Sequence, residues 1–455
     1  MPNLFRKNAL ASACAVLATS AGLLASVPAQ AVSLSTTGEG QVLIFPYYTV
    51  RGGNDTSVVV INGSAQGKVV SVRMRESKNG RPGIDFKVYL APHDSWTGTL
   101  TATAKGARLV SADKTCTVPK IPAKGVDLTK IFQFPDDGAG VSEERNREGY
   151  LEVIELGVVT NAAVLADITP VGAAAPACTP VLHGDMSAQA GDRALAPPSG
   201  GLSGSATLAN VSRGTELGYA PVVLEGFSEM NLWSVHNDAD LRMANPAISL
   251  VLDKQRPIIS HWVQGEDAVS AVLMSQSLRN EFDLDPGTGK GTDWVVNMPT
   301  KHYYVQSAAN PLPTQAPFTT AFNAKGACEY QYPDDGLFWN RDGETDYQIP
   351  TPGRPLPPAL CWESSVLTFN GSNVLASANR YDLETPYSQG VPFSNGWTEI
   401  LFNAPGQQLV SLEGHVYNGL PVTGFRVQDL GKGRLSSYGG TFEHSYVRAI
   451  ETTTP

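Results

Sequence analysis

Two stretches, Val70-Ser-Val-Arg-Met-Arg75 and Ile84-Asp-Phe-Lys-Val-Tyr-Leu90, decide the fold class of this sequence. In both of them apolar and polar side chains alternate with a period of two. That period is typical of a β-strand with one buried face and one solvated face. The sequence therefore predicts half-buried strands that pair as a hairpin.

Other stretches have the β-branched and aromatic composition of strands. They are Gln41 to Val50 with a break at Pro46, Ser57 to Ile61, Thr97 to Thr101, Gly149 to Leu156 and, further on, Ser365 to Arg448 with Asn-Gly turns at 370, 395 and 418 and a Gly-Lys-Gly turn at 431. The order of the first strands, with an Asn62-Gly63 turn after the second, resembles an immunoglobulin-like sandwich.

The composition agrees with many short strands. Charged residues make up 17% of the chain, and 44 glycines and 32 prolines favour turns over long helices. We predict an all-β protein of two or three immunoglobulin-like or β-sandwich units, with long Pro- and Gly-rich loops. One amphipathic helix is expected near 267–282, with Asp267 as its N-cap.

The expected organisation has four parts, which follow from the composition along the chain. These are a signal peptide at 1–31, an N-terminal β-sandwich region at 32–185, a Gly-, Pro- and Ala-rich linker or loop at 186–204, and a C-terminal β-rich region at 205–455.

The N-terminus has the pattern of a secretory signal peptide. Arg6 and Lys7 precede an apolar run, and Ala29 and Ala31 fit the small-x-small cleavage site, so cleavage is expected after Ala31. A membrane anchor is the alternative, but no later stretch approaches ~20 apolar residues. We expect export through an inner membrane to the periplasm, the outer surface or the medium, with no transmembrane segment in the mature chain.

Without residues 1–31 the chain has 31 basic and 43 acidic residues, a formal charge of −12. Nucleic acid is an unfavourable partner for such a chain, because phosphate binding needs a basic surface. A protein or a polysaccharide at the cell surface is the expected partner.

Four cysteines remain after processing: Cys116, Cys178, Cys328 and Cys361. An even number in an exported chain predicts two disulfides. Three connectivities are open, and the order along the chain favours Cys116 with Cys178 and Cys328 with Cys361. Zinc is the alternative, but CxxC-type spacing is absent.

No catalytic motif is present in the sequence. It has neither a GxSxG elbow nor an HExxH pair, and we assign no catalytic residue. The alternative is a secreted hydrolase acting on polysaccharide, for which Glu152, Glu155 and Glu225 are available carboxylates. Seven tryptophans are compatible with sugar stacking, although filling β-sandwich cores is their more common use.

One acidic loop has the spacing of a weak calcium site. Asp342, Glu344 and Asp346 alternate after Asn340, and Gly343 lets the backbone bend towards an ion. Calcium is therefore the one cofactor we consider. A solvated acidic turn is the alternative, since the closing glutamate and flanking helices of an EF-hand are absent.

Several segments resemble a family of exported proteobacterial proteins that has no established activity. The segments are Val42 to Val50, Gly149 to Glu155, Gly291 to Val296, Pro299 to Tyr303, Gly419 to Phe425 and Tyr438 to Gly440. The resemblance implies export and one co-folding unit over 32–455, and it carries over no site residue. The leading expectation is a non-enzymatic cell-envelope or extracellular protein with a binding or structural role.

Overall fold

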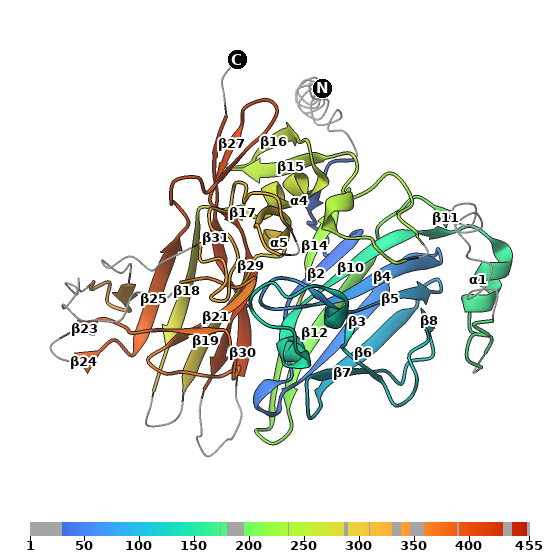
Figure 1. The fold of residues 1–455 in the computed structure, drawn as a ribbon, viewed down its shortest axis with the longest axis horizontal. Coiled ribbons are helices and arrows are strands. Elements are labelled where there is room, and N and C mark those ends of the chain that lie inside the picture. Colours follow the sequence, from blue (N-terminus) through green and yellow to red (C-terminus); the bar gives the residue numbers. More distant parts are fainter. Residues whose placement is uncertain are drawn as a thin grey trace, which may run out of the picture.

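The computed structural model describes residues 30–172, 174–179, 195–234, 236–285, 290–308, 310–329, 338–345, 359–388, 391–430 and 439–452. Within them the protein consists mainly of antiparallel β-sheets (Figure 1), which confirms the all-β class. Residues 1–29 of the expected signal peptide and 186–194 of the expected linker lie outside the described residues.

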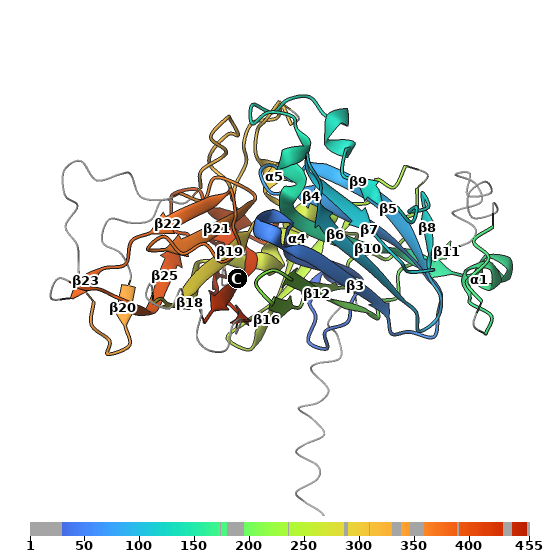
Figure 2. The same cartoon turned by 90° about the horizontal axis from the view of Figure 1, so that it is seen from below.

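Two large sheets form the N-terminal half. The first has the order β1 (Ser33–Leu34), β14 (Val222–Glu225), β2 (Val42–Thr49), β10 (Glu148–Val159), β4 (Lys68–Glu76), β5 (Pro82–Leu90) and β8 (Cys116–Val118), with β11 (Leu195–Ala196) paired to β10. The second has the order β13 (Thr215–Tyr219), β12 (Leu202–Asn210), β3 (Asp55–Asn62), β6 (Ser95–Ala102), β7 (Ala107–Val110) and β9 (Val126–Asp127). Figure 2 shows these sheets at one end of the molecule.

The core of this half lies between the two sheets. Val70, Val72 and Met74 of β4 pack there with Trp96 of β6, all of them at most 1% exposed. The period-two pattern therefore predicted correctly which side chains of β4 enter the sandwich. The expected break at Pro46 is a shift in register between β2 and β10 rather than an interruption of the strand.

The C-terminal half is built around two further sheets. One has the order β22 (Arg380–Leu383), β21 (Ser364–Phe369), β19 (Gly291–Asn297), β29 (Thr423–Asp429) and β30 (Gly439–Glu443). The other has the order β20 (Phe338–Asn340), β25 (Asn395–Leu401), β18 (Ser277–Asp283) and β31 (Ser445–Val447). Aromatic side chains including Trp294, Phe282 and Phe369 fill the space between them.

Short elements complete the described part of the chain. The small sheets are β15 (Ile248–Asp253) with β16 (Arg256–His261), β17 (Met274–Ser275) with β28 (Leu420–Pro421), β23 (Tyr387–Ser388) with β24 (Val391–Pro392), and β26 (Gln408–Val410) with β27 (Val416–Asn418) and β32 (Ala449–Glu451). The helices are α1 (Ala162–Ile168), α4 (Gly265–Leu273) and α5 (Lys301–Tyr304), and short 3-10 turns are η1 (Arg51–Gly53), η2 (Lys130–Gln133), η3 (Glu143–Arg147) and η4 (Leu241–Met243).

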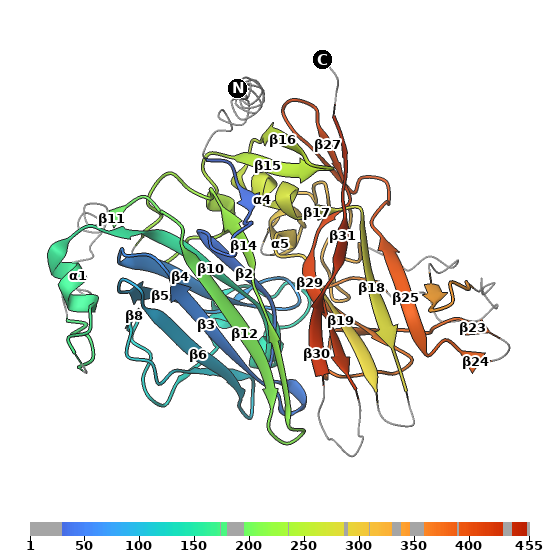
Figure 3. The ribbon, with the colours of Figure 1, turned by 180° about the vertical axis from the view of Figure 1, so that it is seen from behind.

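The N-terminal sheets extend beyond the expected linker at 186–204. Strand β12 begins inside it at Leu202 and pairs with β3, and the later strands β13 and β14 pair with β12 and β2, so the chain leaves the first pair of sheets after Glu225. Composition marked a loop there, but strand pairing over long sequence distances is not visible in composition. The halves pack closely, since Phe425 of β29 stacks on Tyr219 of β13 with ring centroids 4.4 Å apart. Figure 3 shows β30 beside the edge of the sheet that carries β12, where β13 is the edge strand.

The expected helix near 267–282 is wrong in its second part. Helix α4 ends at Leu273, and β18 begins at Ser277 and pairs with β25 and β31. In β18, Leu278 and Phe282 are buried while Arg279 is exposed. The absence of Gly and Pro in this segment had favoured a helix over a strand. Gln264, not Asp267, is the N-cap.

No helix among the described residues is long and apolar enough to span a membrane.

The expectation of half-buried strands is also wrong for β4 and for Phe86 to Leu90 of β5, which are buried on both faces, as are β2 and β10 of the same sheet. The polar side chains of the alternation form ion pairs beneath the C-terminal half. Arg75 Nε lies 2.8 Å from Glu152 Oε1, and their side chains are 4% and 0% exposed. Arg75 also donates to the hydroxyl of Tyr303 in α5, at 3.4 Å.

Both expected disulfides are present, with Cys116 joined to Cys178 and Cys328 joined to Cys361. Among the expected turns, Asn370-Gly371 is a turn with positive φ at both residues. Asn395-Gly396 instead lies inside β25, where Gly396 allows Trp339 of β20 to approach closely. The Gly431 to Gly433 turn lies outside the described residues.

Replacing Arg75 with leucine is expected to lower the free energy of unfolding by about 3–5 kcal/mol, because Glu152 then lacks its buried counter-charge. The double variant Arg75→Leu with Glu152→Leu should recover much of this loss, since neither charge is then buried. Urea unfolding followed by circular dichroism measures both. Equal destabilisation in the single and double variants would contradict this account.

Replacing Cys116 and Cys178 together with serine is expected to lower the free energy of unfolding by roughly 4 kcal/mol, because the bridge closes a loop with a sequence separation of 62. Thermal melts of the wild type and the double variant measure the change. The native protein should contain no titratable thiol at these positions. A disulfide-linked peptide joining the two halves, found by mass spectrometry, would contradict the pairing.

Candidate functional site

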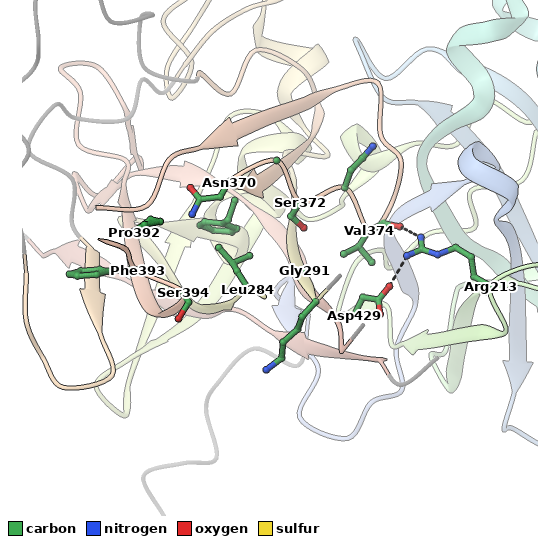
Figure 4. Close-up of a pocket in the computed structure, with 14 residues that line it drawn as sticks. Arg213, Leu284, Gly291, Asn370, Ser372, Val374, Pro392, Phe393, Ser394 and Asp429 are labelled. Carbon is green, nitrogen blue, oxygen red and sulfur yellow. Dashed lines mark hydrogen bonds and ion pairs between the residues drawn. The ribbon is translucent and has the colours of Figure 1, made fainter. Parts of the chain in front are cut away.

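A cavity of about 300 Å³ lies where the β12–β13 turn of the N-terminal half meets the strand ends of the C-terminal half (Figure 4). Its lining comes from five separate segments of the chain. The lining residues are Arg213, Leu284, Lys290, Gly291, Phe369, Asn370, Gly371, Ser372, Asn373, Val374, Pro392, Phe393, Ser394 and Asp429.

The cavity combines an apolar floor with a polar rim. Leu284, Phe369 and Phe393 are buried. Polar side chains, among them Ser372 and Ser394, surround this floor. A largely apolar pocket with a few polar groups is the usual form of a small-molecule site in proteins.

The turn at Asn370 and Gly371 shapes one wall. The φ angles of Asn370 and Gly371 are 47° and 78°, in the left-handed region that asparagine and glycine tolerate best. The Gly371 amide donates to the Asp382 carboxylate at 2.8 and 3.0 Å, and Asn370 exchanges hydrogen bonds with Thr385. The wall is therefore held by side chains that lie outside the cavity.

Asp293 of β19 supports the same wall from below. Its carboxylate accepts hydrogen bonds from Ser372 Oγ at 2.9 Å and from the Leu375 amide at 2.8 Å. Burial raises the pKa of Asp293 to about 6, although these two hydrogen bonds act in the opposite direction. With both oxygens occupied, Asp293 positions the 370–375 loop.

An ion pair between the two halves closes another side. Arg213, from the N-terminal half, donates to Asp429 Oδ2 at 2.6 Å and to the carbonyl of Val374 at 3.1 Å (Figure 4). Asp429 and Val374 both belong to the C-terminal half. The cavity therefore exists only where the halves are docked.

Two residues that line the cavity lie next to strands of the β20–β25–β18–β31 sheet, since Leu284 follows β18 and Ser394 precedes β25. Asp283 of β18 accepts from Lys290 Nζ at 2.7 Å and from Arg341 at 3.4 Å. Nearby, Trp339 and Trp397 stack with ring centroids 3.9 Å apart and an interplanar angle of 11°. Sequence reasoning expected tryptophans in cores. That holds for Trp96, Trp233, Trp262 and Trp294, whereas Trp339, Trp362 and Trp397 are only partly buried.

The acidic loop expected to bind calcium is held by its own hydrogen bonds. Asn340 Oδ1 accepts from the amides of Asp342 and Glu344, and Asn340 Nδ2 donates to Glu344 Oε2 at 2.8 Å. Asp346 lies outside the described residues. Among the described residues no three His, Cys, Asp or Glu side chains form a cluster that would hold a metal ion. Calcium binding stays a prediction of the sequence.

The carboxylates named for a hydrolase serve other roles. Glu152 is paired with Arg75, and Glu155 accepts from Lys68 Nζ at 2.6 Å with both side chains fully buried. Glu225 accepts from Ser35 Oγ at 2.6 Å. None of the three lines the cavity.

A buried cluster that sequence reasoning missed lies between the halves. Tyr150 donates to Glu363 Oε1 at 2.7 Å, and His302 Nδ1 is 2.6 Å from the same oxygen. Burial raises the pKa of Glu363 well above its usual range and lowers the pKa of His302 well below its own. Only long-range folding joins these positions, so no local sequence signal reveals them.

Comparisons with family models, curated proteins and solved structures gave no match for this chain. The resemblance to exported proteobacterial proteins therefore stays a prediction, and the site is interpreted from its own chemistry.

Asp293 is expected to make stability depend on pH. Because its pKa is raised in the folded state, the stability it contributes is present at pH values below about 4 and is lost as the pH rises through about 6. A rise from 3.8 to about 6 corresponds to roughly 3 kcal/mol. Urea unfolding between pH 4 and pH 7 should show this loss in the wild type and not in Asp293→Asn. Parallel pH profiles for the two proteins would contradict the assignment.

Proposed function

We propose that this chain is an exported, non-enzymatic binding protein of the cell envelope or extracellular space, built on immunoglobulin-like sandwiches. Its ligand occupies the cavity between the two halves. The two disulfides support a location outside the cytoplasm, because such bonds persist in oxidising compartments. The signal-peptide pattern of residues 1–31 supports the same location.

The acid–base content of the cavity is the observation that carries this proposal. Among the described residues that line it, Asp429 is the only carboxylate, and it is engaged by Arg213 at 2.6 Å. Hydrolysis of a glycosidic bond usually requires two carboxylates on opposite sides of the bond. The lining thus supports holding a ligand better than cleaving one.

The hydrolase alternative has less support. Of its three available acids, Glu152 and Glu155 are buried in ion pairs on β10, and Glu225 accepts from Ser35; none of them lines the cavity. Asp293 lies close to the cavity, but Ser372 and Leu375 occupy both of its oxygens. A general acid must reach the leaving group directly or through one water.

Replacing Ser394 with tryptophan is expected to abolish ligand binding, because Ser394 is exposed at the rim and the larger ring would occupy the cavity. The readout is cosedimentation of the purified protein with isolated cell envelopes. Retention of the wild type should fall at least several-fold in Ser394→Trp. Ser142→Trp, at an exposed position outside the cavity lining, is the matched control and should behave as the wild type.

Two outcomes would overturn the proposal. One is equal retention of Ser394→Trp and wild type on the envelopes. The other is a time-dependent release of soluble envelope fragments by the wild type, which would show hydrolysis.

A further inference from the structure

Trp339 and Trp397 form a partly exposed aromatic surface at the edge of a sheet. They lie directly opposite each other on β20 and β25, and their rings are nearly parallel, 3.9 Å apart. An indole that stays at the surface keeps a broad apolar area together with an N–H donor. That combination suits a ligand with one apolar face and polar edges.

The aromatic surface and the cavity are connected by the chain that leads into β25. Ser394 lines the cavity, and Trp397 follows three residues later, about 10 Å along an extended chain. The Leu284 amide donates to the Ser394 carbonyl at 2.7 Å, which fixes the cavity floor to this strand. Side chains three positions apart in a strand point to opposite faces, so a linear molecule contacts both features by passing around the start of β25 at Ser394.

The charges along this route nearly cancel. Lys290 and Arg341 share the single carboxylate of Asp283, which leaves one positive charge, and Arg213 is paired with Asp429. Glu281, opposite Trp397 on β18, pairs with Arg426 at 3.1 Å. Paired charges offer hydrogen-bond donors and acceptors without a strong net field, so they complement a neutral polar ligand better than a polyanion.

From these observations we infer that the ligand is a neutral carbohydrate chain. One sugar enters the cavity, where its apolar face meets the slightly exposed edges of Leu284, Val374 and Phe393 and its hydroxyls meet the rim that includes Ser372. The chain continues over the Trp339–Trp397 surface. This assignment rests on the binding function proposed above and names the class of ligand.

The competing explanation is that the tryptophan pair only stabilises the edge strand β20. Cross-strand aromatic pairs contribute roughly 0.2–1 kcal/mol to a sheet. In that case removing one ring lowers the melting temperature slightly and leaves carbohydrate binding unchanged. The two explanations therefore differ in a binding measurement.

The experiment titrates the full mature protein with linear hexasaccharides of glucose in β-1,4 and α-1,4 linkage, of xylose, of mannose and of N-acetylglucosamine. Hexagalacturonate serves as the anionic comparison. Tryptophan fluorescence and calorimetry report binding. The variants are Trp397→Ala, Trp339→Ala, Trp397→Phe and Ser394→Trp, and the control is Trp362→Ala, which removes a partly buried tryptophan outside the cavity lining.

We expect at least one neutral hexasaccharide to bind. Its affinity should fall about tenfold in Trp339→Ala and Trp397→Ala, recover in part in Trp397→Phe, and stay at the wild-type value in Trp362→Ala. Thermal melts confirm that each variant is folded.

Failure to bind any neutral hexasaccharide would overturn the inference, as would full affinity in Trp397→Ala or tighter binding of hexagalacturonate. If Ser394→Trp still loses retention on cell envelopes in that situation, the proposed binding function stands and only the carbohydrate assignment falls.

Discussion

The buried outer face of the β1–β14–β2–β10–β4–β5–β8 sheet is the constraint on which the rest of the molecule depends. Arg75 and Glu152 lie on that face as an ion pair with almost no exposure. Leaving one member of a buried pair without its partner costs several kcal/mol, so the C-terminal half must cover both at once. Two further hydrogen bonds connect the same sheet to the C-terminal half. Tyr150 donates to Glu363, and Glu148 accepts from Ser377 at 2.6 Å. One docking geometry satisfies all of these groups, and the cavity at Arg213 and Asp429 results from it.

Local sequence predicted the elements whose causes are local. Period-two alternation placed Val72 and Met74 in the sandwich core, and the Asn370-Gly371 turn and both disulfides were predicted from residue type and order. What covers Arg75 depends on Tyr303, more than 200 positions away, so the burial of the polar face had no local signal. The helix near 267–282 shows the same limit. Residues 277–283 lack helix breakers, yet pairing with β25 and β31 makes them a strand.

The candidate site could not be predicted from the sequence for a related reason. Its chemistry comes from Arg213, Lys290, Ser372 and Ser394, which carry no motif and meet only through the topology. The acidic loop did have a motif-like spacing, but Asn340 uses its amide to hold the Glu344 carboxylate. For the tryptophans, the positions in the structure are more informative than the count in the sequence. Their total number does not distinguish core packing from ligand binding, whereas the stacking of Trp339 on Trp397 at a surface edge is the observation on which the proposed ligand class rests.

Perturbed pKa values often mark catalytic centres, because catalysis needs acids and bases tuned by burial. Here the strongly shifted groups have a different distribution. Glu363, His302 and Glu152 owe their shifts first to burial and sit in the contact between the halves, away from the cavity lining. Asp293 comes nearest, and it holds a loop with both oxygens. The shifted pKa values of these three groups therefore reflect burial where the halves are joined, and the cavity itself contains apolar, hydroxyl, amide and ion-paired groups.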